Sequence, residues 1–177
     1  EEAFAYVTEI RKLVRYLEIC DGNMEEGSLR CDANISVRKK GDTKLGTKVE
    51  VKNLNSIRNV KRAIEVEAKR LVDILESGGT ITQQTRSFDA NNGTTFAIRD
   101  KEDADDYRYF AEPDLTPFHL EEEFIEKIRH SIPELPEQRI QRYTSALKLS
   151  DYDAGVLTEE KIFSNYEAKI LDGISKE

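Results

Sequence analysis

Five polar side chains that could bind a metal ion and a phosphate group lie on two short stretches with alternating spacing. Arg30, Asp32 and Asn34 occupy every second position of the first stretch, and Glu50 and Lys52 do so in the second. Alternate residues of a β-strand point to the same face of a sheet. If the two strands are neighbours, Asp32 and Glu50 supply oxygen ligands for one hard divalent cation. The cations around them suit a phosphate chain.

The apolar residues between these polar ones fix which strand faces pair. Burial of these apolar residues determines the strand register, because a shift of one strand by one residue would expose them to water. They are Leu29, Cys31, Ala33, Ile35, Val37, Val49 and Val51. The pattern alone favours a simpler interpretation of the polar face, a solvated surface with cross-strand ion pairs, because alternating charged faces are common.

Other candidate sites have weaker signals. The run from Lys52 to Ser56 places two amides and a hydroxyl at the start of a helix, where backbone N–H groups favour an anion, although capping alone explains these residues. His119 and His130 are isolated in the sequence. Cys31 falls on the apolar face, which favours a core position over a nucleophile. The sequence contains no Gly-x-Ser-x-Gly, Walker or Gly-x-Gly-x-x-Gly motif.

Composition excludes several classes of protein. The chain has 177 residues, 38% of them hydrophobic, and a net charge of −8, which argues against a nucleic-acid binder that relies on bulk positive charge. No apolar run approaches the roughly 20 residues of a membrane span. Two cysteines form no disulfide framework, so we expect reduced thiols and a cytoplasmic location, bacterial, archaeal or in an organellar matrix. The chain begins as if within a helix, which suggests a fragment.

Up to residue 100 the sequence predicts two helices and two hairpins. The first helix precedes the first hairpin, and the second helix lies between the two hairpins. We expect a helix over 3–20, ended by the turn formers at 21–23. The remaining elements are strands at 28–38 and 47–53, a helix opened by Ser56 and ended by Gly78, a hairpin of 80–88 with 94–100, and a short strand at 107–110. In the second hairpin, Phe88, Phe96 and Ile98 should share one face.

After residue 120 the sequence shows helical patterns and no further strand pattern. Helices are expected at 121–130, 137–147 and 159–173. We therefore predict an α+β fold in which an antiparallel-hairpin sheet with helices, residues 1–120, precedes an all-helical segment, residues 121–177.

Several longer motifs resemble those of the B subunit of tRNA-dependent amidotransferases, the GatB family. They occur in the family's order and cover nearly the whole chain, and two of them exceed seven residues. The matching runs are 24–36 (MEEGSLRCDANIS), 50–56 (EVKNLNS), 85–89 (TRSFD), 106–110 (DYRYF), 132–136 (IPELP) and 151–158 (DYDAGVLT).

The resemblance implies an architecture for the chain. It looks like the second half of the family's cradle domain, followed by the first helices of its helical domain. The opening part of the cradle, which carries further metal ligands in the family, has no counterpart here. Ala111 stands where the family usually has proline, which puts the local turn in doubt.

The resemblance also implies a function. The family uses ATP and Mg²⁺ to phosphorylate the side-chain carboxylate of a misacylated tRNA, Glu-tRNA(Gln) or Asp-tRNA(Asn), and ammonia then displaces the phosphate. Its partners are the glutaminase A subunit and the C subunit. The expected metal ligands are Asp32 and Glu50, and the expected catalytic residues are Arg30, Asn34 and Lys52. Second candidates, for cofactor binding or a tunnel wall, are Asn53, Asn55, Arg86, Tyr107 and Arg108.

Two alternatives stay open at this point. The chain could be a non-catalytic module that only contacts the other subunits. It could also be an unrelated domain that binds magnesium and nucleotide without tRNA.

Overall fold

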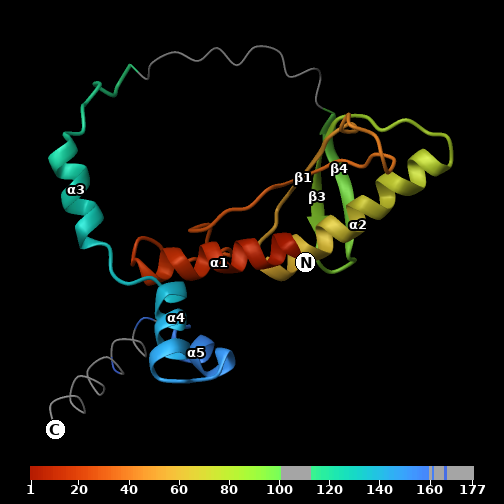
Figure 1. The fold of residues 1–177 in the computed structure, drawn as a ribbon. Helices are drawn as coiled ribbons and strands as arrows, with labels where there is room; N and C mark the ends of the chain where they lie inside the picture. Colours follow the sequence, from red (N-terminus) through yellow and green to blue (C-terminus); the bar gives the residue numbers. More distant parts are fainter. Residues whose placement is uncertain (101–112, 160, 162–165, 167–177) are drawn as a thin grey trace, which may run out of the picture. The chain divides into compact units, whose positions relative to one another are not determined.

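A four-stranded mixed sheet with helices forms the first part of the chain, which confirms the predicted α+β class. The computed structural model describes residues 1–100, 113–159, 161 and 166. Its sheet has the order β1-β2-β3-β4, and helix α2 packs against it (Figure 1). None of the described helices is long and apolar enough to cross a membrane.

The first two strands pair as the alternation predicted, but they are much shorter. β1 (Ala33–Ile35) and β2 (Val49–Lys52) are antiparallel, with Asn34 opposite Glu50. The apolar positions of both strands are buried and the polar ones are not. The expected strand over 28–38 is therefore wrong at both ends, because the flanking segments form loops instead of pairing.

Helix α2 (Ile57–Glu76) connects β2 to β3 and makes these two strands parallel. Ser56 caps the helix as predicted, since its hydroxyl accepts a hydrogen bond of 3.1 Å from the Asn59 N–H. In the parallel register Glu50 pairs with Thr85 and Lys52 with Ser87. A helical crossover allows this parallel pairing, which a tight hairpin cannot make. The sheet is thus not built from antiparallel hairpins alone.

The second hairpin forms where the sequence predicted it, with one wrong detail. β3 (Gln84–Asp89) and β4 (Thr94–Asp100) are antiparallel. Phe88 pairs with Thr95, whereas Phe96 pairs with Ser87, so Phe88 and Phe96 point to opposite faces. Phe88 is buried, while Phe96 and Ile98 are more than half exposed. The expectation that these three residues share one face is therefore wrong.

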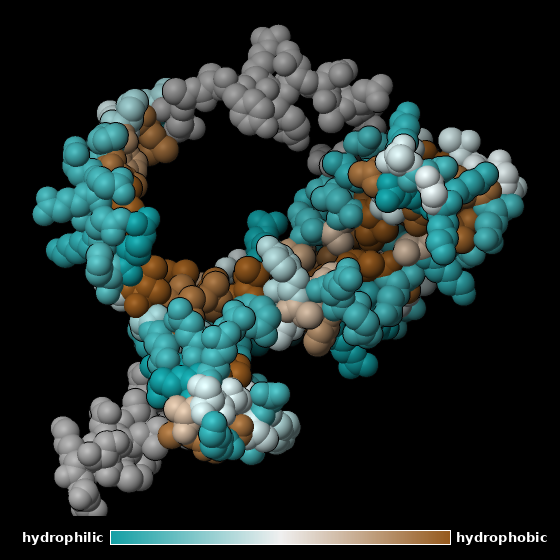
Figure 2. Space-filling model, viewed as in Figure 1, coloured by the Kyte–Doolittle hydropathy of each residue, from teal (hydrophilic) through white to brown (hydrophobic). Residues whose placement is uncertain are grey.

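The hydrophobic core lies between α2 and one face of the sheet. It combines Val49 and Val51 of β2 with Val60, Ala63 and Leu71 of α2, all at most 1% exposed. Figure 2 shows hydrophilic residues over much of the visible surface in this part, with smaller hydrophobic areas between them. The other face of the sheet carries the polar side chains of β1 and β2 and the exposed Phe96 of β4.

The chain divides into two compact units, and helix α1 (Glu2–Tyr16) contributes residues to both. The first unit comprises Glu1–Thr8 and Asn23–Phe110, and the second comprises Glu9–Gly22 and Ala111–Glu177. The helix ends at Tyr16, before the predicted turn at 21–23, because Glu18 adopts a left-handed conformation (φ 58°). The boundary that we expect near residue 120 stays a prediction.

The second unit contains three further described helices. They are α3 (Glu122–Ser131), α4 (Pro136–Ala146) and α5 (Asp151–Leu157), and no strand follows Asp100 in the described part of the chain. The first two were predicted, but α5 was missed. Its signal is Ser150, whose hydroxyl caps the Asp153 N–H at 3.1 Å. Most of the helix expected at 159–173 and the strand expected at 107–110 lie outside the described residues.

Candidate functional site

The carboxylates of Asp32 and Glu50 converge on one cation, the ammonium group of Lys52. Lys52 Nζ lies 2.7 Å from Asp32 Oδ2 and 3.4 Å from Glu50 Oε1. Asp32 immediately precedes β1 and continues its alternation, which brings it opposite Lys52 on the neighbouring strand. This confirms the prediction that the two carboxylates lie on the same face of antiparallel neighbours. Asn34, opposite Glu50, is exposed on that face too.

The charge of Lys52 is stabilised by this arrangement. Its hydrogen bond to Asp32 raises the pKa of the ammonium group, partial burial opposes the shift, and the charges of Asp32 and Glu50 add to it. The Glu50 side chain is 15% exposed, compared with 39% for Asp32. Glu50 is thus the less hydrated of the two carboxylates, and its charge interacts with a cation more strongly than that of an exposed acid.

Thr85 of β3 belongs to the same group, although no pattern in the sequence pointed to it. Its hydroxyl donates a hydrogen bond of 3.2 Å to Glu50 Oε2, and the residue is 1% exposed. The parallel pairing of β2 with β3 creates this contact, since it places Thr85 beside Glu50. Glu50 is therefore oriented by a hydroxyl at one oxygen and an ammonium at the other.

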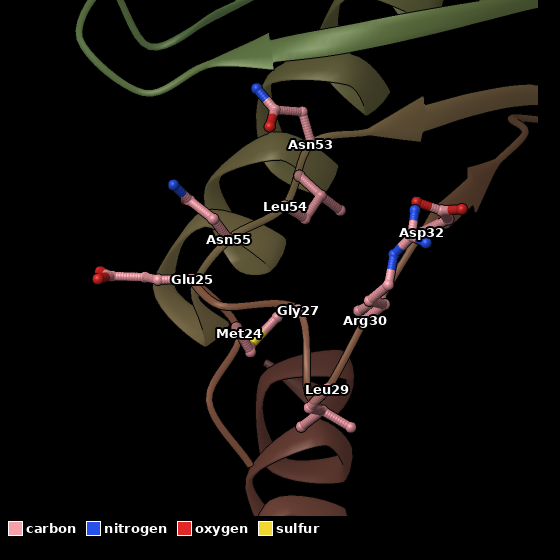
Figure 3. A pocket seen from close by; sticks show the side chains of 10 residues that line it. Met24, Glu25, Gly27, Leu29, Arg30, Asp32, Asn53, Leu54 and Asn55 are labelled. Carbon is pink, nitrogen blue, oxygen red and sulfur yellow. The ribbon is translucent and has the colours of Figure 1, made fainter. Parts of the chain in front are cut away.

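A cavity of about 180 Å³ adjoins this face and shares Asp32 with it. Four expected site residues line it: Arg30, Asp32, Asn53 and Asn55. In the view of Figure 3, Arg30 and Asp32 lie on one side, Asn53, Leu54 and Asn55 lie on the other, and Glu25 points outward. Met24, Glu25 and Gly27 also line the cavity, although their sequence pattern did not predict a place in the site.

A closed turn holds the segment that carries Arg30. The side-chain oxygen of Asn23 accepts hydrogen bonds from the N–H groups of Glu25, at 3.0 Å, and Glu26, at 3.3 Å, as in an Asx turn. The Leu29 N–H then donates to the Asn23 carbonyl at 3.2 Å. This turn reaches Leu29, the second residue of the expected strand over 28–38, and sets one wall of the cavity.

The opposite wall is the loop from β2 to α2. Asn53 has a left-handed backbone (φ 63°), which asparagine tolerates better than most residues. The side-chain oxygen of Asn55 accepts a hydrogen bond of 2.8 Å from the side-chain amide of Asn59, and Ser56 caps the helix. The backbone of this wall is therefore fixed directly after Lys52, the last residue of β2.

Arg86 lies away from this group, on the core side of the sheet. It pairs in register with the buried Val51 and lies 3.4 Å from the carboxylate of Glu67, which is fully buried on α2. Arg86 also donates to the Thr95 carbonyl at 2.8 Å, and Arg70 forms a further ion pair with Glu67. The structure thus does not bring Arg86 to the carboxylates of Asp32 and Glu50.

The arrangement of Asp32, Glu50 and Lys52 can hold a cation and orient an anion. Mg²⁺ is commonly bound through one or two carboxylates together with waters and substrate phosphates, so this oxygen donor set fits it. No group of three or more His, Cys, Asp or Glu residues suited to a metal occurs among the described residues. Burial raises the pKa of the Cys31 thiol, as does the charge of Asp32, which disfavours a nucleophilic thiolate. Tyr107 and Arg108 lie outside the described residues.

Comparison with known proteins identifies the family. Residues 1–126 match the family model of the GatB/GatE catalytic domain. The B subunit of the aspartyl/glutamyl-tRNA(Asn/Gln) amidotransferase from Alkalilimnicola ehrlichii is 53% identical over 170 residues, which are 96% of this chain and 36% of that protein. The protein of the same name from Thermodesulfovibrio yellowstonii is 50% identical over 179 residues, 100% of this chain and 38% of that protein.

The chain thus spans little more than a third of the length of these relatives. The match does not favour the alternative of an unrelated magnesium-binding domain. Since the family model covers well over half of the residues, this chain belongs to the GatB/GatE catalytic domain family.

Proposed function

We propose that this chain is part of the B subunit of an ATP- and glutamine-dependent aminoacyl-tRNA amidotransferase. That enzyme is a carbon–nitrogen ligase, which converts Glu-tRNA(Gln) or Asp-tRNA(Asn) to the amidated aminoacyl-tRNA. Its proposed partners are a glutaminase A subunit, a C subunit and the misacylated tRNA. The observation that carries the proposal is the convergence of Asp32 and Glu50 on one cation position in a member of this family.

The chemistry requires activation of a carboxylate, which is a poor electrophile in its ionised form. Phosphorylation by ATP converts its oxygen into a leaving group that ammonia can displace. Bound Mg²⁺ would neutralise phosphate charge during this transfer. Asp32 and Glu50 would hold that ion, because both present carboxylate oxygens to one point and Thr85 orients Glu50.

Lys52 has a second role in this proposal. A divalent cation would compete with its ammonium group for the same two carboxylates. When displaced, Lys52 stays protonated and can bind a phosphate oxygen or the substrate carboxylate. Arg30 and Asn34, both exposed beside Asp32, would bind the same anions. Asn53 and Asn55 would form the wall against which the aminoacyl end or the nucleotide lies.

Amidation by the full-length protein, assembled with its partners, tests the proposal. With Glu-tRNA, ATP and Mg²⁺, the Lys52→Ala variant should form Gln-tRNA about 10²-fold more slowly than the parent, the loss typical of a preorganised charge donor. The matched control is Lys69→Ala, an exposed lysine on α2, which should leave the rate unchanged. The defect should persist with ammonium in place of glutamine, since ammonium bypasses the glutaminase. Equal rates for Lys52→Ala and its control would contradict the proposal.

A further inference from the structure

The loop between β1 and β2 carries a concentration of positive charge in an acidic chain. Residues 36–48 contain only one carboxylate, Asp42, and five cations, which gives five minus one, or +4, whereas the whole chain carries −8. The cations are Arg38, Lys39, Lys40, Lys44 and Lys48, and all five are exposed. The proposed catalytic residues do not account for this charge.

None of these cations is neutralised by a carboxylate within the described residues. The ion pairs there join other side chains, and Arg38 donates only to a backbone carbonyl. A solvated face that contributes to folding commonly mixes both signs of charge. An unpaired cluster of one sign instead raises the local concentration of anions around it.

The loop also has a defined conformation. Arg38 Nη1 donates to the Thr43 carbonyl at 3.0 Å, and the Asp42 N–H donates to the Lys39 carbonyl at 3.1 Å. Gly41 closes the turn with φ 99°, and a Cβ on Gly46 would collide with the Val37 carbonyl oxygen. The chain thus folds back on itself, so binding of a partner requires less ordering than binding by a flexible loop.

We propose that this basic loop, Arg38–Lys48, binds the phosphate backbone of the tRNA substrate. The proposal rests on the proposed function, in which the protein binds a polyanion. Within this chain, attraction to RNA has to come from local cations, because the net charge of −8 of these 177 residues is unfavourable for RNA binding. The loop lies at the opposite end of β1 and β2 from Asp32 and Lys52. Strands of three and four residues separate the two by roughly 10 Å, a distance that a tRNA spans easily.

Equilibrium binding of tRNA to the full-length protein in its complex tests this loop without requiring chemistry. The variant Lys39→Ala/Lys40→Ala/Lys44→Ala removes three charges, and Lys69→Ala on α2 is the control for an exposed lysine elsewhere. At about 0.15 M salt the triple variant should bind tRNA on the order of tenfold or more weakly. The slope of log affinity against log salt concentration should fall by about 2 to 3, because each lost phosphate contact releases roughly one counterion fewer.

The outcomes separate the loop from the proposed function. An unchanged dissociation constant and salt slope would overturn the loop proposal. Weakened assembly with the partner subunits at unchanged tRNA affinity would overturn it too, since the loop would then be a protein contact. A parent complex that fails to amidate Glu-tRNA would refute the function, while the binding data would still decide the loop. The single charge reversal Lys40→Glu, with its urea midpoint measured, distinguishes lost binding from lost folding.

Discussion

Substitution of Glu67 by glutamine should strongly destabilise this chain. The carboxylate is fully buried, with Arg86 at 3.4 Å, Arg70 as a further ion-pair partner and the Thr95 hydroxyl as a donor. The Arg86 side chain is only 11% exposed. Loss of the negative charge would leave that guanidinium buried and uncompensated, which typically costs about 3–5 kcal/mol. With a urea m-value of about 2 kcal/mol/M, the unfolding midpoint should fall by roughly 1.5–2.5 M.

The control is Glu65→Gln, the same change two residues away on α2. Glu65 is exposed and lies 3.9 Å from Lys61, a surface ion pair, so its loss should change the unfolding free energy by less than about 1 kcal/mol. Equal midpoints for the two variants would refute the reasoning, because burial would then have no energetic consequence.

The same comparison has a predictable pH dependence. Burial raises the pKa of Glu67, but hydrogen bonds from Arg70 and Thr95 and the charges of Arg70 and Arg86 outweigh it and lower the pKa overall. A lowered folded pKa means that the stabilisation is present above the unfolded value and is lost as pH falls through the folded one. The difference in unfolding free energy between the parent and Glu67→Gln should therefore be largest near neutral pH and should decrease below about pH 4.

Three further predictions concern the site. Asn53→Gly should change the free energy of unfolding in urea by only a few tenths of a kcal/mol. Asn53→Val should lower it by about 1–2 kcal/mol, because a left-handed backbone disfavours a β-branched residue. Equal costs for the two variants would contradict the left-handed assignment. Lys52→Met should tighten Mn²⁺ binding to the nucleotide-free full-length protein, because it removes the ammonium group that competes for Asp32 and Glu50. Electron paramagnetic resonance measures this binding, and weaker binding would argue against one position shared by the ammonium group and the metal ion. The isolated 177-residue chain should form no Gln-tRNA from Glu-tRNA with ATP, Mg²⁺ and ammonia, since the resemblance implies further metal ligands outside it, and any Gln-tRNA formed would refute this.

The polar face of the sheet was predictable because it follows from alternation alone. The apolar residues of β1 and β2 determine the register, and this register brings Asp32 and Glu50 together. Capping by Ser56 was equally readable, since the hydroxyl directly precedes a helical pattern. These signals lie within a few residues of the structure that they specify.

Features that depend on distant pairing were not predictable. Thr85 reaches Glu50 only because β3 runs parallel to β2 after the α2 crossover. In the sequence, Glu67 is one more charged residue of a helical pattern. Its burial depends on Arg86, which comes from strand β3. The first predicted strand starts later than expected where a local turn forms, because the Leu29 N–H donates to the Asn23 carbonyl instead of to a neighbouring strand.

The magnesium requirement of amidation tests the central claim most directly. In the full-length protein with its partners, Asp32→Asn and Glu50→Gln should each raise the Mg²⁺ concentration for half-maximal formation of Gln-tRNA by on the order of tenfold or more. Asp73→Asn and Glu65→Gln, which alter exposed carboxylates of α2, should leave it unchanged. If all four variants keep the Mg²⁺ dependence of the parent, Asp32 and Glu50 do not hold the metal ion.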